Sequence, residues 1–420
     1  MTQLAKGSNA VKTPLEVLAL YPVHNRTLHG MLESRTAVDP ARLFLMFQQK
    51  TWSYGDFQKE VEHAARMLIS QGIQKGDRVS IMAPNSDNWI ILFFAIARIG
   101  AILVPVNPDF NVMEARYILT HAEVSAVACT TDNLKIVQQA CDGMTTPPWY
   151  MLLEGRSDVI PSFDDLLQSS PKSTLPNDIS PNDICLIMYT SGTTGFPKGV
   201  MHSQENFILT GEGFVERMHL QPDDRLLCVL PLFHINALFY TLAGTVAAGA
   251  SIATTHRFSA SNFWQLVAET QATEVNIIAA VGNILVNRPR SEFVPGHKLS
   301  RVYAAPITQR MWEVFTQEFG VPRMTEGYGM TEIPGACNIP FLGPYKIGSM
   351  GKPALHPDHD MPFAELRVVN DEGLDVPMGE IGELLVRTPI LMKGYYKDPG
   401  QTAAAFRDGW FMTGDLVRQD

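Results

Sequence analysis

One loop of this chain combines hydroxyl side chains, glycines and a single lysine in a spacing that suits phosphate chemistry. From Tyr189 to Gly199 it reads Tyr-Thr-Ser-Gly-Thr-Thr-Gly-Phe-Pro-Lys-Gly. Glycines let backbone N–H groups close on an anion, the hydroxyls add donors, and Lys198 supplies a positive charge. The spacing differs from that of a Walker A loop, which ends in Gly-Lys-Ser or Gly-Lys-Thr. The loop therefore predicts a site for a polyphosphate.

The residues before this loop indicate where it lies. Ile184 to Tyr189 form an apolar run that is typical of a buried strand. The loop then follows the carboxyl end of a strand, which is where open α/β sheets bind ligands. A solvated Ser/Thr/Gly linker is the alternative, but the embedded lysine and the flanking strand argue against it.

Four further motifs follow the loop. They are Pro-Leu-Phe-His at 231–234, Tyr-Gly-Met-Thr-Glu at 328–332, Gly-Glu-Leu at 382–384 and Thr-Gly-Asp at 413–415. In this order they resemble the adenylate-forming superfamily, which includes acyl-CoA synthetases, nonribosomal adenylation domains and beetle luciferases. The resemblance extends from about residue 40 to the last residue. It implies ATP-dependent activation of a carboxylic acid to acyl-AMP with release of pyrophosphate, followed in the complete enzyme by transfer to coenzyme A.

Charge neutralisation and alignment must supply most of the catalysis in such a reaction, because an anion attacks the phosphorus of another anion. The resemblance makes Lys198, Thr331 and Glu332 the catalytic residues. Glu332 would hold Mg²⁺, which usually binds through one or two carboxylates and the substrate phosphates. Tyr328 would stack on adenine, and Asp415 would accept both ribose hydroxyls. The expected nucleotide-binding residues are Thr190, Ser191, Gly192, Thr193, Thr194, Gly195, Ala304, Ala305, Pro306, Glu326, Gly327, Tyr328, Gly329, Met330, Thr331 and Asp415.

The resemblance also predicts the acid pocket. His234 would be the aromatic gate between the acid and the nucleotide, although taken alone it is typical of a core histidine. Several expected lining residues are small and none is Lys or Arg, which favours a medium-sized, largely apolar acid. The stretch from Phe258 to Trp264 resembles instead the carnitine- and betaine-type CoA ligases, and it favours a zwitterionic acid. The expected substrate-binding residues are His234, Ile235, Asn236, Phe239, Val281, Gly282, Gly327, Gly329, Ile333, Pro334 and Ala336.

The chain departs from the family pattern at three places. Glu326 stands where many relatives carry Gln or Asn near the adenine amine, and Gln204 stands where many carry His. The sequence also stops at Asp420, before the hinge and the mobile C-terminal domain in which relatives carry a second catalytic lysine and the surface for coenzyme A. We therefore expect a core that binds ATP and acid, adenylates slowly and forms essentially no thioester.

Three other functions fit the same motifs. The acyl group could pass to a carrier-protein thiol or to an amine instead of coenzyme A. The chain could be a nucleotide- or acyl-binding core without turnover. Oxidation of the luciferase kind also fits, and an assay for light would test it.

Composition limits the class of protein further. The 420 residues are 45% hydrophobic, which is enough for a large core in two or three subdomains. The net charge of −10 and the lack of a Lys/Arg run argue against nucleic acid as a partner. The five cysteines are scattered, which predicts free buried thiols in a reducing compartment. No apolar run is long enough to span a bilayer. We expect a cytoplasmic protein that binds a small carboxylic acid, ATP and coenzyme A, with a homodimer as one option for its assembly.

Hydrophobic periodicity predicts an α/β fold with two doubly wound, mostly parallel sheets flanked by helices, and a small β-barrel after residue 341. The expected division is 1–180 and 181–340 for two α/β subdomains, the second with the phosphate loop and acyl pocket, and 341–420 for the barrel. Residues 143–183 are expected to be a surface connection. Expected helices are 56–71, 88–98, 112–121, 237–247, 261–269 and 309–319; expected strands are 78–82, 101–106, 124–129, 184–189, 226–230, 251–255, 274–278, 301–304, 365–369 and 383–386.

Overall fold

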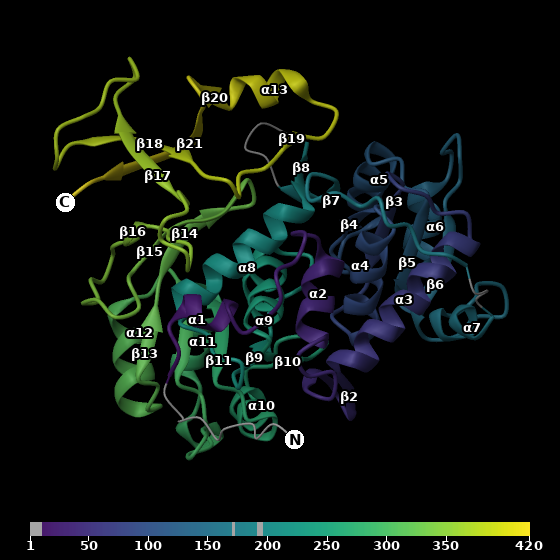
Figure 1. Cartoon of the computed structure of the whole chain (residues 1–420), viewed down its shortest axis with the longest axis horizontal. Helices are drawn as coiled ribbons and strands as arrows, with labels where there is room; N and C mark the ends of the chain where they lie inside the picture. Colours follow the sequence, from purple (N-terminus) through teal and green to yellow (C-terminus); the bar gives the residue numbers. More distant parts are fainter. Residues whose placement is uncertain (1–10, 170–172, 191–195) are drawn as a thin grey trace.

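The computed structural model describes residues 11–169, 173–190 and 196–420 of the chain. Two seven-stranded sheets form its main body, and a smaller antiparallel sheet lies above them in the view of Figure 1. We call the first large sheet sheet I. Its order is β13-β12-β11-β9-β10-β1-β2, and all neighbours are parallel except β1 and β2. Its strands are β1 (Leu43–Phe47), β2 (Lys50–Ser53), β9 (Arg225–Cys228), β10 (Ser251–Thr254), β11 (Glu274–Ile278), β12 (Arg301–Ala305) and β13 (Arg323–Thr325).

The second large sheet, sheet II, has the order β19-β8-β7-β4-β3-β5-β6. The strands from β7 to β6 in this order are parallel, whereas β8 pairs antiparallel with both β7 and β19. Its strands are β3 (Arg78–Met82), β4 (Ile102–Pro105), β5 (Ala126–Thr130), β6 (Trp149–Glu154), β7 (Ile184–Thr190), β8 (Lys198–Ser203) and β19 (Gly394–Tyr395). The expected mostly parallel, doubly wound architecture is confirmed.

Helices cover the faces of the two sheets (Figure 1). Local signals explain where several of them begin: Ser86 accepts a hydrogen bond from the backbone N–H of Trp89, and Asn111 forms a capping box with Glu114. The helices are α1 (Pro14–Leu18), α2 (Leu28–Thr36), α3 (Tyr54–Ser70), α4 (Asp87–Arg98), α5 (Val112–His121), α6 (Thr131–Cys141), α7 (Phe163–Gln168), α8 (Gln204–Met218), α9 (Ala243–Ala248), α10 (Phe263–Thr270), α11 (Ala279–Asn287), α12 (Gln309–Glu313) and α13 (Pro399–Ala404), with a 3₁₀ turn η2 (Arg290–Glu292) and π-helical turns η1 (Asn236–Leu242) and η3 (Val314–Glu318).

One hydrophobic core joins the two large sheets. Helix α4 is apolar on nearly all sides and contacts β1 of sheet I and β4 of sheet II. Its residues Trp89, Phe93 and Phe94 are at most 2% exposed and belong to the same cluster as buried side chains of both sheets. Burial on all sides explains why this helix lacks the amphipathic pattern of a surface helix. The sheets are therefore held at a fixed relative position beneath the site.

The remaining strands form two smaller antiparallel sheets. Sheet III consists of β14 (Gly327–Met330), β15 (Ile333–Asn338) and β16 (Lys352–Pro353). Sheet IV is a curled antiparallel sheet that stands where a small β-barrel is expected after residue 341, and its order is β17-β18-β21-β20. Its strands are β17 (Glu365–Val369), β18 (Ile381–Arg387), β20 (Phe406–Arg407) and β21 (Trp410–Arg418).

Several sequence expectations differ from the structure in detail. Residues 143–183 are not only a connection, because they contain the edge strand β6 and the helix α7. The expected helix at 237–247 begins as the π-helical turn η1, and the expected helix at 309–319 ends as η3. The division into 1–180, 181–340 and 341–420 stays a prediction, but strand pairing crosses residue 180: β7 and β8 belong to sheet II with β3 and β4, and β1 and β2 belong to sheet I.

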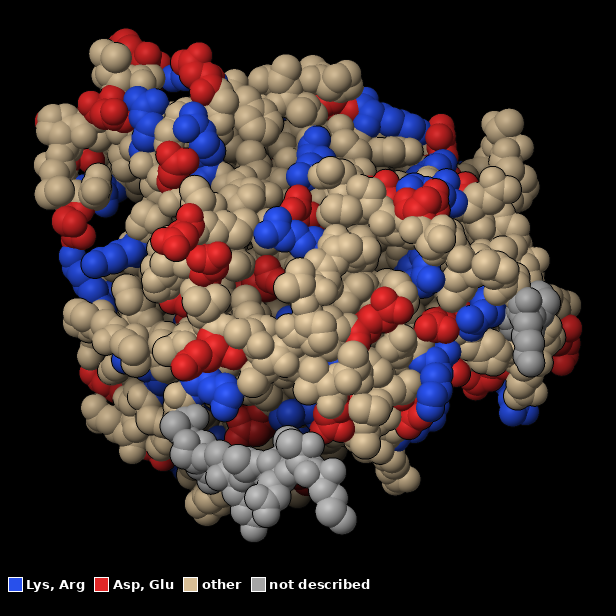
Figure 2. Space-filling view, in the orientation of Figure 1, with Lys and Arg blue, Asp and Glu red and all other residues tan. Residues whose placement is uncertain are grey.

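All five cysteines are buried and free, as expected. Across the described residues, none of the helices has both the length and the apolar character needed to cross a bilayer. On the face seen in Figure 2, acidic and basic side chains are interspersed over the described surface. This mixed charge fits the net negative balance of the sequence.

Candidate active site

The phosphate loop is the turn of a β-hairpin. Strands β7 and β8 pair antiparallel, and Thr190 lies opposite Lys198 at the open end of the ladder. Ser191, Gly192, Thr193, Thr194 and Gly195 lie outside the described residues. Gly199 allows the strands to pack closely, because a Cβ there would lie 2.9 Å from Cγ2 of Ile187. The hairpin therefore fixes Lys198 at the carboxyl edge of sheet II, next to the end of β7.

The expected catalytic pair Thr331 and Glu332 forms a second hairpin turn. Met330 of β14 pairs with Ile333 of β15, and Thr331 and Glu332 are therefore the turn between the two strands. The backbone carbonyl groups of Thr331 and Glu332 both accept hydrogen bonds from residues in or next to the strands of sheet II. His202 Nε2 donates to the Thr331 carbonyl at 2.7 Å, and the Met392 backbone N–H donates to the Glu332 carbonyl at 2.8 Å.

His202 holds this turn as a neutral ring. Its side chain is fully buried, and burial lowers the pKa of His202 to about 4. Since a carbonyl oxygen only accepts, the Nε2 atom must carry the proton. Its ring also packs against Phe239, with the centroids 4.9 Å apart. His202 is not expected from the sequence, because it carries no motif signal of its own.

Tyr395 links the two hairpins. Its hydroxyl donates to Glu332 Oε1 at 2.9 Å, and the Lys198 ammonium lies 5.0 Å from the centroid of its ring. Tyr395 reaches this place because β19 pairs with β8, with Tyr395 opposite Val200. Burial and the neighbouring Glu332 carboxylate raise the pKa of Tyr395, so the hydroxyl remains a donor. The expected lysine and carboxylate are thus brought to one ring by a residue that the sequence did not single out.

Two more motifs meet at Tyr328. Its hydroxyl donates to Asp415 Oδ2, although the two residues are 87 positions apart. The Thr-Gly-Asp turn is held by the Gly-Glu-Leu motif, because the Gly414 N–H donates to Glu383 Oε1 at 3.1 Å and the Thr413 hydroxyl donates to the Leu384 carbonyl at 2.8 Å. Asp415 itself is exposed. The adenine and ribose residues expected from sequence therefore lie together.

The two unusual residues have distinct surroundings. Glu326 is buried, which raises the pKa of its carboxyl group, and its Oε2 accepts from the Ile307 N–H and the Tyr345 hydroxyl, both at 3.1 Å. It thereby joins the start of β14 to the segment that follows Ala304, Ala305 and Pro306. Gln204 is fully buried, donates to the Ala97 carbonyl at 2.9 Å and accepts from the Leu28 N–H at 3.0 Å. It ties α8 to α4 and α2.

The expected acid-binding residues surround the start of η1 and the strands β14 and β15. His234 is exposed, with its ring 4.4 Å from that of Phe233. Phe239 is fully buried and also packs on Phe207, at 5.7 Å between centroids. The others divide by exposure: Ile235 and Asn236 are half-buried, Gly329 is exposed, and Val281, Gly282, Gly327, Ile333, Pro334 and Ala336 are buried.

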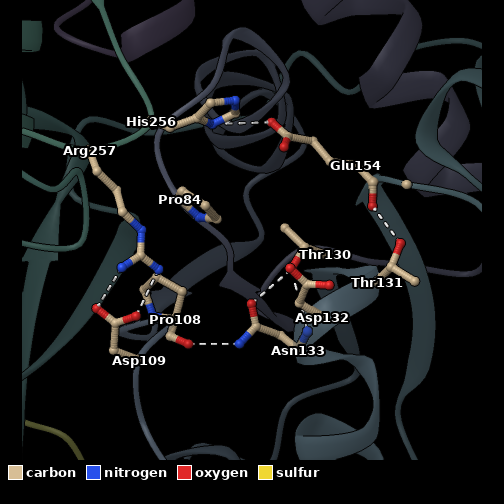
Figure 3. A pocket seen from close by; sticks show the side chains of 11 residues that line it. Pro84, Pro108, Asp109, Thr130, Thr131, Asp132, Asn133, Glu154, His256 and Arg257 are labelled. Atoms are coloured by element: carbon tan, nitrogen blue, oxygen red, sulfur yellow. Dashed lines mark hydrogen bonds and ion pairs between the residues drawn. The ribbon is translucent and has the colours of Figure 1, made fainter.

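A separate cleft of about 600 Å³ lies at the carboxyl ends of β3, β4, β5, β6 and β10 (Figure 3). It shares the carboxyl edge of sheet II with the phosphate hairpin, but none of the expected nucleotide or acid residues lines it. Four of the side chains that line it form two pairs: Arg257 contacts Asp109 at 2.7 Å, and His256 lies 3.7 Å from Glu154. Asp132 also lines the cleft.

Comparison with known proteins decides the family. The model of the family described as AMP-binding enzyme matches residues 32–396. The chain belongs to this family. As an AMP-binding enzyme, it uses ATP and Mg²⁺ to activate a carboxylic acid as acyl-AMP with release of pyrophosphate, and the activated acyl group is then transferred to coenzyme A.

Individual relatives of the AMP-binding enzyme agree with this assignment. The chain is 30% identical over 402 residues to a sulfoacetate–CoA ligase of Cupriavidus necator, covering 94% of this chain and 76% of the relative. It is 30% identical over 416 residues to a crotonobetaine/carnitine–CoA ligase of Salmonella paratyphi A, covering 95% and 78%. The fold is similar to that of a long-chain-fatty-acid CoA ligase from Rhodopseudomonas palustris, with a TM-score of 0.85, 26% identity, and coverage of 95% of this chain and 98% of that one.

Proposed function

We propose that the two hairpin turns and the Thr-Gly-Asp turn form one active site for acid adenylation. The observation that carries this proposal is the contact of both Lys198 and Glu332 with Tyr395. A cation and a buried carboxylate around one phenol suit a ligand that carries several negative charges together with a divalent cation.

Within this proposal Lys198 attracts the β- and γ-phosphates, and Glu332 supplies the carboxylate for Mg²⁺. The donor set fits that ion, because Glu332 is a buried carboxylate in the turn between β14 and β15, and Mg²⁺ is commonly held by one or two carboxylates together with substrate phosphates. Bound Mg²⁺ would neutralise charge that develops on the leaving pyrophosphate.

The rest of the site orients the reactants. The Thr331 hydroxyl is proposed to donate to the α-phosphate, and His202 fixes the backbone of the turn that carries it. The acid carboxylate attacks the α-phosphorus, the bond to the bridging oxygen breaks, and pyrophosphate leaves with that electron pair. Coenzyme A thiolate then attacks the acyl carbon, and AMP leaves. Holding the attacking and leaving oxygens in line is the main contribution of the protein.

Tyr395→Phe tests the link between the hairpins. The ring that faces Lys198 is kept, but the donor to Glu332 is lost. We expect kcat for adenylation to fall by about 10- to 100-fold, because one hydrogen bond to a charged group contributes about 1.5–3 kcal/mol. Pyrophosphate release at saturating ATP measures it. Tyr396→Phe is the matched control, since that tyrosine lies next in the chain but does not contact Glu332; an equal loss in both variants would contradict the proposed role of Tyr395.

Asp415→Asn tests the ribose site. Asn lacks the charge of the carboxylate, which is proposed to accept hydrogen bonds from both ribose hydroxyls. The substitution is therefore expected to weaken ATP binding by about 10- to 100-fold. The same variant should lose the preference for ATP over 2′-deoxy-ATP and 3′-deoxy-ATP, measured by calorimetric titration. Asp408→Asn is the control, because Asp408 is an exposed residue in the turn between β20 and β21. A variant that still discriminates against both deoxynucleotides would place the ribose elsewhere.

The relatives suggest two classes of acid. Sulfoacetate carries a second anionic group beside its carboxylate, whereas crotonobetaine and carnitine carry a quaternary ammonium group. A cytoplasmic location and assembly as a homodimer are also proposals. The five buried free thiols support the former, because free cysteines are typical of reducing compartments.

A further inference from the structure

A buried cation lies beside the proposed acid site. Arg217 is on α8, a helix that contacts β15, and its side chain is 3% exposed. Its Nε and Nη1 atoms have no hydrogen-bond partner within the described part of the chain. A charge removed from water costs several kcal/mol unless it is paired. An anionic partner for this guanidinium would therefore lower the cost of burying its charge.

Aromatic rings surround Arg217 on one side. The guanidinium carbon lies 4.9 Å from the ring centroid of Tyr240, 5.5 Å from that of Tyr303 and 5.7 Å from that of Phe214. Such contacts contribute about 0.5–2 kcal/mol each, so they offset only part of the cost. The hydroxyls of Tyr240 and Tyr303 also interact with the guanidinium, which lowers their pKa, but burial raises the pKa of both tyrosines by more. Both hydroxyls therefore stay protonated and do not neutralise the charge.

The acidic residues nearest in the sequence are occupied elsewhere. Glu212 lies 3.1 Å from His356 and 3.6 Å from His24. Glu216, the neighbour of Arg217, lies 3.3 Å from His359. Both carboxylates therefore contact histidines from other segments, and neither forms an ion pair with Arg217.

Arg217 also packs against the backbone of sheet III at Gly335, which lies next to Gly329 of the neighbouring strand. A Cβ on Gly335 would lie 2.1 Å from the Nη2 atom, so the guanidinium packs against the bare backbone of that residue. A Cβ on Gly329 would lie 2.7 Å from the Tyr240 hydroxyl and 2.6 Å from the Gly335 nitrogen. Because Gly329 is exposed, this corner can be reached from the surface of the site. Side chains at either glycine would separate Arg217 from a ligand.

We propose that Arg217 is the counter-ion for a second anionic group on the acid, so that the enzyme activates short acids that carry a further carboxylate or a sulfonate. This inference rests on the proposed active site around Glu332. Glu332 lies in the turn directly before β15, and Gly335 is the third residue of that strand, so the two positions are at most about 10 Å apart. A short acid can therefore place a second anionic group near Arg217 while its carboxyl group is activated beside Glu332.

The same geometry argues against a quaternary ammonium substrate. The faces of Phe214, Tyr240 and Tyr303 could bind such a cation, but the guanidinium of Arg217 already lies against them. A second cation would meet like charge in a buried place. An apolar acid would leave Arg217 without a partner.

The test compares acids that differ only in the second charge. Succinate is paired with its monoamide succinamate, and glutarate with glutaramate, with γ-butyrobetaine as the cationic acid; acyl-AMP is measured by mass spectrometry and rate by pyrophosphate release. We expect kcat/KM for the di-acids to exceed that for the amides by about 100-fold, in line with the loss when one partner of a buried charge pair is removed. Arg217→Met should lower the di-acid value far more than the amide value, so that the preference for the di-acid is lost.

Arg217→Lys is the control that keeps the charge, and it should retain part of the preference for the di-acid. If Arg217 only supports the fold, Arg217→Met lowers the rates with di-acid and amide equally and lowers the melting temperature, which overturns the proposal. Comparison of the paired acids in the unsubstituted chain needs no variant, and equal rates there also overturn it. The absence of acyl-AMP from every acid would instead contradict the proposed active site.

Discussion

Glu332→Gln is expected to lower kcat/KM for acyl-AMP formation by about 100- to 1000-fold, since one preorganised charge-stabilising contact in a water-excluded site contributes about 2.7–4 kcal/mol. Gln keeps the size of the side chain and can still accept from the Tyr395 hydroxyl, but it lacks the charge that Mg²⁺ requires. The remaining activity should respond weakly to Mg²⁺ concentration. Pyrophosphate release, followed over a series of Mg²⁺ concentrations, measures both effects.

Glu365→Gln is the matched control for this variant. Glu365 is an exposed residue of β17 that lies 3.8 Å from Arg387, far from the two hairpin turns in the sequence. Its substitution should leave the rate and the Mg²⁺ response unchanged. If Glu332→Gln has the same rate and the same Mg²⁺ response as Glu365→Gln, Mg²⁺ is held without the Glu332 carboxylate.

Lys198→Ala is expected to produce the second large effect, a loss of about 100-fold in kcat/KM for ATP. The ammonium group lies at the open end of the phosphate hairpin, where it offsets charge on the phosphates. The loss should be smaller for binding of AMP, which lacks the β- and γ-phosphates. Titration with ATP and with AMP, together with pyrophosphate release, separates the two contributions.

Lys397→Ala is the control for the lysine. Lys397 follows β19, close to Tyr395 in the chain, but it pairs with Glu123 at 2.8 Å. ATP and AMP binding should be unchanged in this variant. If Lys198→Ala weakens ATP and AMP equally, the lysine contacts the α-phosphate or the nucleoside, and the assignment to the β- and γ-phosphates is wrong.

The sequence predicts best those elements that local signals specify. Strand β3, helix α5 and strand β11 begin and end where the apolar pattern and the caps place them. Helix α4 was found from its continuous apolar run, which its burial between the two sheets explains. These features depend on residues close together in the chain.

The sequence fails where pairing with a partner strand, and not local periodicity, decides whether a strand forms. Strand β8 is short and partly polar, and it forms because it completes the hairpin with β7. Strand β6 is an edge strand that pairs with β5 within a stretch rich in loop-forming residues. Both were overlooked, because a single strand in such a context carries little periodic signal.

The site shows the same contrast. Glu332 and Asp415 were named through motifs, but Tyr395 and His202 act through contacts with residues 63 and 129 positions away. Arg217 lies on a helix that the sequence analysis did not predict, and it approaches the acid site only because Gly335 has no side chain. The expected pocket residues include no Lys or Arg, so they omit Arg217, the buried cation proposed to contact the acid.

The most direct test of adenylation at this site is mass spectrometry of the chain incubated with ATP, Mg²⁺ and a panel of mono-acids, di-acids, sulfonate acids and betaines, with and without coenzyme A. We predict an acyl-adenylate with at least one acid, formed only when Mg²⁺ is present and strongly reduced in Glu332→Gln and Lys198→Ala. An adenylate that forms equally well in both variants, or none from any acid, would contradict the account.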